Sequence, residues 1–305
     1  MLKGMPTLSR LCLGTVQFGL DYGVSNRSGK PEESEVANIL SYAAESGVGY
    51  LDTASDYGNA EDLIGRYLPR GFSPRIVTKL PSIGNEVISP TQKQFVSDSI
   101  SRSLERMRVD RLHAALLHNV MDLAKPGAEY LVEALLDAQG RGEVSLIGAS
   151  VYDADQISLV QQHFRPQLIQ LPFSALDRRL SKSGALKNLK SAGAEIHARS
   201  IFLQGLLLMD PQKLPDFFAP LRQHIDSVRL NWEKRGLTAL SGAIASVLAQ
   251  KEIDVVVVGV NRKSEFVEIV DSIRGAFEGS TEFDSDFAIN PIYLNPARWP
   301  SFTKS

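Results

Sequence analysis

Short apolar runs rich in β-branched residues alternate with amphipathic segments along the whole chain. Eight runs are predicted to be strands: 10–15, 50–54, 75–80, 112–118, 144–150, 167–173, 195–201 and 254–260. Between these runs apolar residues recur at helical spacing, as in Val36, Ile39, Leu40 and Ala43, which is typical of a helix with one buried face. Gly47 follows that stripe, where a helix commonly ends. The pattern therefore predicts eight strand–helix units.

Eight such units favour a single (β/α)8 TIM barrel over residues 1–305, with a C-terminal tail from about 280 to 305. An open doubly wound sheet fits less well, because no predicted strand is followed by G-x-G-x-x-G, and the 23–30 segment lacks P-loop spacing. Residues 202–236 are predicted to form an elaborated loop after the seventh strand, and long loops at this end of a barrel usually carry function.

The composition changes this picture little but excludes several classes of protein. The chain is 43% hydrophobic and its formal charge is −2, which gives no electrostatic case for a nucleic acid or an anionic membrane as partner. A single cysteine, Cys12, excludes an internal disulfide framework and a cysteine-based zinc site, and no metal site is predicted. Without a signal-like apolar segment, a cytoplasmic location is expected. The pattern does not specify an oligomeric state.

Titratable side chains stand at the ends of three consecutive predicted strands. Asp52, Lys79 and His118 end the second, third and fourth strands, and Tyr57 follows Asp52 closely. In barrels the active site gathers at these strand ends. Taken singly, each residue also has a structural interpretation: an ion pair, an interior histidine, a packing aromatic. Together the four predict a catalytic site.

The chemistry of the four residues is mutually consistent. A lysine ammonium about 4 Å from a phenol favours the phenolate by about 4 kcal/mol at an effective dielectric near 20, so Lys79 is predicted to lower the pKa of Tyr57 toward about 7. Asp52 would orient Lys79, and His118 would position a substrate oxygen. Such a site can move protons at a carbonyl or an alcohol, but electrons must come from a cofactor.

The loop after the eighth strand, GVNRKSE (259–265), opens the last predicted helix and carries two adjacent cations. A solvated helix start is one interpretation. The other is that Arg262 or Lys263 meets a phosphate, such as the 2′-phosphate of an NADP cofactor.

These motifs together resemble the aldo-keto reductase family over about residues 9–275. The matching segments are LDTASDYG, VTKL, LLHN, IGAS, LIQLPFS, HARSIFLQGLL and VVVGVNRKSEFVE. The resemblance implies an NADP(H)-dependent oxidoreductase that reduces an aldehyde or ketone, or runs the reverse reaction, by direct hydride transfer. It implies Tyr57 as the acid, Lys79 and Asp52 as the pair that tunes it, and His118 as the residue that orients the carbonyl.

The same resemblance implies a set of cofactor contacts. Ser150 and Gln170 would bond the carboxamide; Ser200, Phe202 and Gln204 would line the pyrophosphate path; the adenosine end would be held by Asn261, Arg262, Glu265 and Glu268. The full expected set is Thr15, Asp52, Ser150, Gln170, Arg199, Ser200, Phe202, Gln204, Gly259, Asn261, Arg262, Glu265 and Glu268.

Two positions depart from the family pattern. Val151 stands where an asparagine usually contacts the carboxamide, and Arg199 stands where an aromatic usually stacks on the nicotinamide. A guanidinium can stack on a flat ring, and its charge should favour the neutral, reduced cofactor over the positively charged oxidised one. Arg199 is therefore hypothesised to bias the protein toward binding NADPH.

The substrate pocket is predicted around Phe18, Tyr22 and Asn119, with contributions from 202–236 and the tail segment 292–300. The substrate itself is a small carbonyl compound of unspecified identity. Two alternatives stay open: a lyase or aldolase that forms a Schiff base on Lys79, and a nucleotide-binding protein that signals redox state to a partner.

Overall fold

The computed structural model of the protein describes residues 7–26, 28–275 and 287–300. Eight parallel strands pair in chain order and close when β8 pairs with β1, which confirms the predicted (β/α)8 barrel. The strands are β1 Leu11–Gly14, β2 Tyr50–Asp52, β3 Arg75–Leu80, β4 Leu112–Leu117, β5 Val144–Ser150, β6 Leu168–Pro172, β7 Glu195–Arg199 and β8 Val255–Gly259. All eight predicted runs contain a strand.

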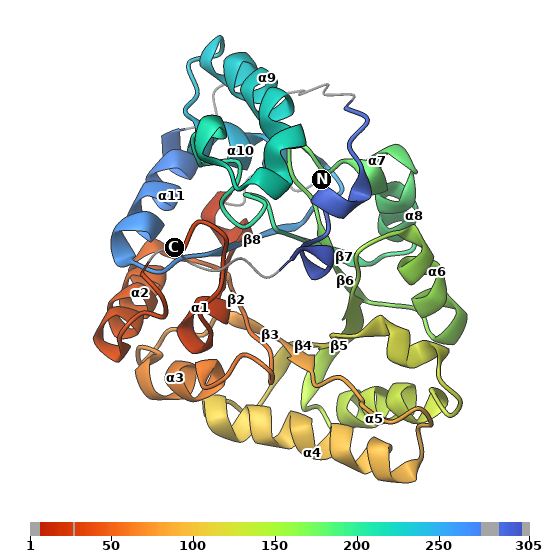
Figure 1. Ribbon diagram of the computed structural model, residues 1–305. Helices are drawn as coiled ribbons and strands as arrows, with labels where there is room; N and C mark the ends of the chain where they lie inside the picture. The colour runs from red at the N-terminus through yellow and green to blue at the C-terminus, as the bar shows by residue number, and fades with distance from the viewer. Residues whose placement is uncertain (1–6, 27, 276–286, 301–305) are drawn as a thin grey trace.

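Helices form a ring outside the strands, as the view along the barrel shows (Figure 1). The α-helices are α1 Val16–Gly19, α2 Glu33–Ser46, α3 Ala60–Tyr67, α4 Pro90–Met107, α5 Glu129–Gly140, α6 Ala154–His163, α7 Arg179–Lys182, α8 Ala185–Ser191, α9 Arg222–Glu233, α10 Ala239–Leu248 and α11 Lys263–Gly275. Short 3-10 helices are η1 Thr7–Arg10, η2 Val120–Ala124, η3 Pro211–Lys213, η4 Asp216–Leu221, η5 Pro291–Tyr293 and η6 Pro296–Arg298.

The core lies between the strands and this ring. The predicted stripe of α2, from Val36 to Ala43, is fully buried against the barrel, and Gly47 ends the helix in a left-handed conformation at φ 74°. Strands such as β1 are buried at every position, because helices cover one face and the barrel interior the other.

The segment after β7 is more ordered than the predicted loop over 202–236. From Pro211 onward it forms η3, η4 and α9. Ile225, Val228 and Trp232 recur at helical spacing and are buried on one face of α9, a stripe that many intervening charged residues obscure in the sequence. The helix packs into a second hydrophobic cluster, in which Gly242 leaves room for the Trp232 ring.

The described part of the tail, 287–300, joins this second cluster through Leu294 and its neighbours. It does not line the cavity at the strand ends described below, so the predicted contribution of 292–300 to the substrate pocket is wrong in this structure. The remaining tail residues lie outside the described part of the chain. No helix over the described ranges has the length and apolar character needed to cross a membrane.

Candidate active site

A cavity of about 1290 Å³ opens at the C-terminal ends of the strands and runs onto the first turns of α11. Ordinary small-molecule pockets span about 300–1,000 Å³, so this cavity has room for a large ligand together with a small one. Every residue of the predicted site lines it except Thr15 and Phe18.

The helical turn α1 explains why these two residues are elsewhere. It follows β1 directly and directs Phe18 into the main hydrophobic core, where its side chain is fully buried, so the predicted substrate contact is wrong. Thr15 is also buried, and its Oγ1 and N–H donate to the Asp52 carbonyl at 3.0 and 2.9 Å. It supports the backbone beside the site and does not line the cavity.

Asp52 and Lys79 form a buried ion pair at the base of the cavity. The Lys79 ammonium donates to both Asp52 carboxylate oxygens at 2.8 Å and to the Thr53 carbonyl at 2.8 Å. Burial alone would lower the pKa of Lys79, but the charge and hydrogen bonds of Asp52 raise it above its ordinary value. Lys79 is therefore a permanent cation at physiological pH.

Tyr57 and His118 lie against this pair. The Lys79 nitrogen is 5.0 Å from the centroid of the Tyr57 ring, and the Tyr57 and His118 rings meet edge to face with centroids 5.8 Å apart. The structure thus brings the four predicted catalytic residues together.

Two glycines fix the backbone that carries Tyr57. A side chain on Gly19, at the end of α1, would come within 1.7 Å of the Tyr57 carbonyl oxygen. Gly58 adopts φ 56°, and a side chain there would meet the Gly19 carbonyl oxygen at 2.6 Å. The turn after β1 and the turn after β2 can therefore touch only because neither position carries a Cβ.

The pKa of Tyr57 is shifted in the direction opposite to the one predicted from the sequence. Although half-buried by solvent accessibility, Tyr57 faces the enclosed base of the cavity, and this burial raises the pKa of the phenol above its ordinary value. The Lys79 ammonium opposes the shift but does not overcome it, so the predicted pKa near 7 is wrong. Burial, assisted by the Lys79 charge, lowers the pKa of His118 to about 4, which makes it a neutral imidazole at pH 7.

Arg199 ends β7 and faces the same cavity. Its guanidinium lies over the Tyr152 ring, 4.2 Å from the centroid, and donates to Ser150 Oγ at 3.3 Å and to the Val151 carbonyl at 3.1 Å. No carboxylate in the described part of the chain lies within 4 Å of it. The two departures from the family pattern are therefore in contact, since Arg199 bonds the backbone of Val151.

A family model described as "Aldo/keto reductase family" matches residues 10–279. The chain belongs to this family. D-arabinose 1-dehydrogenase of Saccharomyces cerevisiae is 29% identical over 165 residues, covering 52% of this chain and 48% of that protein. NADH-specific methylglyoxal reductase of Escherichia coli is 27% identical over 222 residues, covering 66% of each. The chain thus matches about half to two thirds of the length of these relatives.

Solved structures agree on the fold. Glycerol dehydrogenase of Gluconobacter oxydans superposes with a TM-score of 0.69 at 21% identity, covering 92% of this chain and 90% of that one. At such identity the likeness concerns the barrel alone.

The residues of this aldo/keto reductase fit a nicotinamide cofactor. Gln170 donates to Asp52 Oδ1 at 2.6 Å, which leaves its own Oε1 buried without a partner and ready to accept an N–H of a carboxamide. After β7, Ser200, Leu203 and Gln204 have positive φ values of 59°, 49° and 53°. Left-handed residues are common in the backbone nests that bind anions, so this turn is a candidate to lie beside a pyrophosphate.

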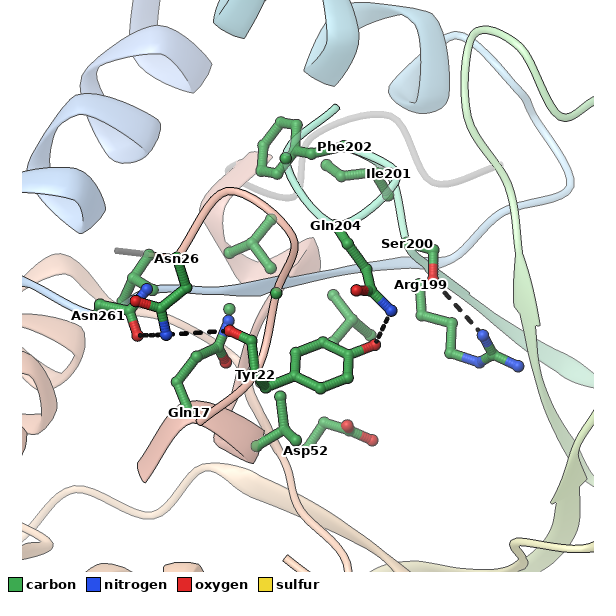
Figure 2. Close-up of a pocket in the computed structure, with 18 of the residues that line it drawn as sticks. Gln17, Tyr22, Asn26, Asp52, Arg199, Ser200, Ile201, Phe202, Gln204 and Asn261 are labelled. Atoms are coloured by element: carbon green, nitrogen blue, oxygen red, sulfur yellow. Dashed lines mark hydrogen bonds between the residues drawn. The ribbon is translucent and has the colours of Figure 1, made fainter. Parts of the chain in front are cut away.

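In this aldo/keto reductase barrel the loop after β1 contacts the loops after β7 and β8 at the cavity. Gln204 Nε2 donates to the Tyr22 hydroxyl at 3.0 Å, and Asn26 Nδ2 donates to Asn261 Oδ1 at 3.3 Å (Figure 2). Burial raises the pKa of Tyr22 to about 12, so this hydroxyl is neutral. The loop after β1 thereby crosses from the predicted substrate pocket to the predicted adenosine end.

The residues that line the cavity but were not predicted from the sequence include Gln17, Ser82 and Tyr152. The Oε1 of Gln17 is buried without a partner, and the missing side chain of Gly259 leaves space for it. Their positions just after β1, β3 and β5 are the signal that could have found them, because residues after barrel strands line the active site. Within the described ranges, no three histidine, cysteine or acidic side chains are grouped to hold a metal ion.

Proposed function

We propose that the protein reduces the carbonyl group of a small aldehyde or ketone, or oxidises the corresponding alcohol, with a nicotinamide cofactor. The observation that carries this proposal is the fully buried Lys79 ammonium, held by both oxygens of Asp52 beside the Tyr57 ring and at the base of a dinucleotide-sized cavity. Such an arrangement suits the transfer of a proton at Tyr57.

The cofactor, when bound, supplies the hydride that this site lacks. Tyr57 gives its proton to the carbonyl oxygen as negative charge develops there. The Lys79 ammonium then stabilises the phenolate that Tyr57 becomes, which no neutral neighbour could do as well in a buried site. His118 is neutral, so it orients the carbonyl by donating an N–H and does not compete as the acid.

Fewer cations line the cavity near the expected 2′-phosphate than the sequence predicts. Of the two cations expected to meet a 2′-phosphate, Arg262 lines the cavity and Lys263 does not. Arg262 alone therefore supports NADP(H), and the relative named NADH-specific methylglyoxal reductase makes NAD(H) equally admissible in the family.

The names of the two relatives reported above indicate small polar aldehydes and sugars as substrates to test first. The decisive experiment offers aldoses, 2-oxoaldehydes and ketones as substrates. It follows the oxidation of NADH and of NADPH by the loss of absorbance of the reduced nicotinamide. Turnover with any of them supports the proposal. Tight cofactor binding without turnover across the panel would instead favour the redox-signalling alternative.

The Schiff-base alternative has less support. Imine formation needs a neutral amine, and the pKa of Lys79 is raised while its ammonium donates to three oxygens. Borohydride in the presence of a carbonyl substrate, without nucleotide, should therefore leave Lys79 unmodified by mass spectrometry. A trapped adduct on this lysine would favour the lyase.

The raised pKa of Tyr57 predicts how the reaction depends on pH. A general acid is active while protonated, so carbonyl reduction should be independent of pH from about 6 to about 9, because the reference pKa of tyrosine is already about 10. Steady-state kcat measured over this range, with saturating cofactor, checks this expectation. A fall in kcat centred near pH 7 would show that Lys79 dominates after all.

Arg199 provides a second prediction, about the cofactor's oxidation state. A cation near the nicotinamide opposes the positive charge of the oxidised ring, so Arg199→Tyr should raise the affinity for the oxidised cofactor relative to the reduced one by about tenfold, or about 1.4 kcal/mol. Fluorescence titration with both forms measures this ratio. An Arg165→Tyr variant, altered outside the cavity, is the control, and an unchanged ratio in Arg199→Tyr would end the hypothesis.

A further inference from the structure

The end of the cavity that lies on α11 is acidic. Glu265, Glu268 and Asp271 recur every three residues, so they lie on one face of the helix, and all three line the cavity. Among the described residues that line this end, Arg262 is the one cation. The region therefore carries a net negative charge where the sequence predicts a phosphate.

Two backbone donors at the start of α11 are already occupied by carboxylates. The Asn261 N–H donates to Glu265 Oε2 at 2.8 Å, and the Lys263 N–H donates to Glu35 Oε1, from α2, at 2.6 Å. A phosphate at a helix N-terminus depends on such free N–H groups and on the positive end of the helix dipole. Here the carboxylates of Glu265 and Glu35 already accept from two of these N–H groups, in the place that a phosphate would take.

The two neighbouring cations are also engaged elsewhere. Arg262 Nη2 donates to Ser28 Oγ at 2.6 Å, and the Lys263 ammonium lies 5.6 Å from the centroid of the Tyr42 ring, outside the cavity lining. Neither forms a preorganised clamp of the kind that binds a phosphate through several donors at once.

We propose that this end of the cavity selects the nicotinamide cofactor with a free 2′-hydroxyl, NAD(H), over NADP(H), with Glu265 as the main specificity-determining residue. Carboxylates accept hydrogen bonds from a ribose hydroxyl, whereas they repel a 2′-phosphate that carries about −1.5 to −2 charges at pH 7. The inference reverses the cofactor predicted from the sequence. It rests on the proposed function, in which the nicotinamide half of the cofactor lies beside Tyr57. The adenosine half of the cofactor then lies at α11.

Equilibrium binding tests the inference without any substrate. The full chain is titrated with NADH and with NADPH at constant ionic strength, and binding is followed by nicotinamide fluorescence. We expect NADH to bind about tenfold more tightly or better. Equal affinities, or tighter binding of NADPH, would overturn the inference and leave the proposed function intact. Failure to bind either cofactor would overturn both.

Variants locate the selectivity. Glu265→Gln removes the charge but keeps an oxygen that can accept the Asn261 N–H, so it should tighten NADPH binding severalfold relative to NADH. Glu133→Gln makes the same change of net charge on α5, where Glu133 pairs with Lys93 far from the cavity lining, and should leave the ratio unchanged. Equal shifts in the two variants would mean that overall charge, not Glu265, sets the preference.

Discussion

Replacing Tyr57 by phenylalanine is expected to lower kcat for carbonyl reduction by about 10²–10⁴-fold, the usual contribution of a positioned general acid. The change removes one hydroxyl and keeps the ring, so the edge-to-face contact with His118 is retained. The Kd of the reduced cofactor should change little, because the phenol serves the reacting oxygen and not the cofactor. Steady-state kinetics and fluorescence titration on the same preparation measure both quantities.

A matched control removes a tyrosine hydroxyl that has no place in the chemistry. Tyr67, at the end of α3, donates its hydroxyl to Glu33 on the surface, and Tyr67→Phe should leave kcat unchanged. If Tyr57→Phe keeps more than about a tenth of the wild-type kcat, less than the smallest loss expected of a general acid, the proton must come from another group.

Breaking the Asp52–Lys79 pair is expected to damage stability as well as activity. Lys79 is 1% exposed and Asp52 7%, so removal of either partner leaves a charge buried without compensation. Such changes cost about 3–5 kcal/mol. Both Asp52→Asn and Lys79→Met should therefore lower the free energy of unfolding by that amount in urea titrations, and both should abolish turnover.

The double variant Asp52→Asn with Lys79→Met separates the two effects. It removes both charges and keeps an oxygen at position 52 for Gln170 Nε2, so stability should return to within about 1–2 kcal/mol of the wild type. Activity should not return, because no cation then stabilises the Tyr57 phenolate. A stable and active double variant would reduce the pair to a structural role.

The parts of the site that could be predicted from the sequence are those fixed by strand periodicity. Active-site residues gather at the C-terminal ends of barrel strands, so strand periodicity alone places Asp52, Lys79 and His118 at one rim. Loop residues are different, because a single helical turn decides which way they face. That is why Phe18 was expected in the pocket while Gln17, one position earlier, lines it.

The electrostatics of the site were harder to predict than its membership. The pairwise attraction between Lys79 and a phenolate follows from charge and distance, but the cost of burying the phenolate depends on how closed the cavity is. In this structure burial outweighs the attraction. The same limit applies at α11, where the sequence displays Arg262 and Lys263 side by side but not the distant Glu35 that reaches the helix start.

The contact between Gly19 and Gly58 has a consequence for directed evolution of this barrel. Because main-chain atoms of the two turns meet at these positions, any side chain at position 19 or 58 would displace the backbone that carries the acid. The loop after β3, where Ser82 lines the cavity, takes no part in this glycine contact and is the better place to randomise in a search for new substrates. Libraries that vary position 19 or 58 should yield almost no active clones.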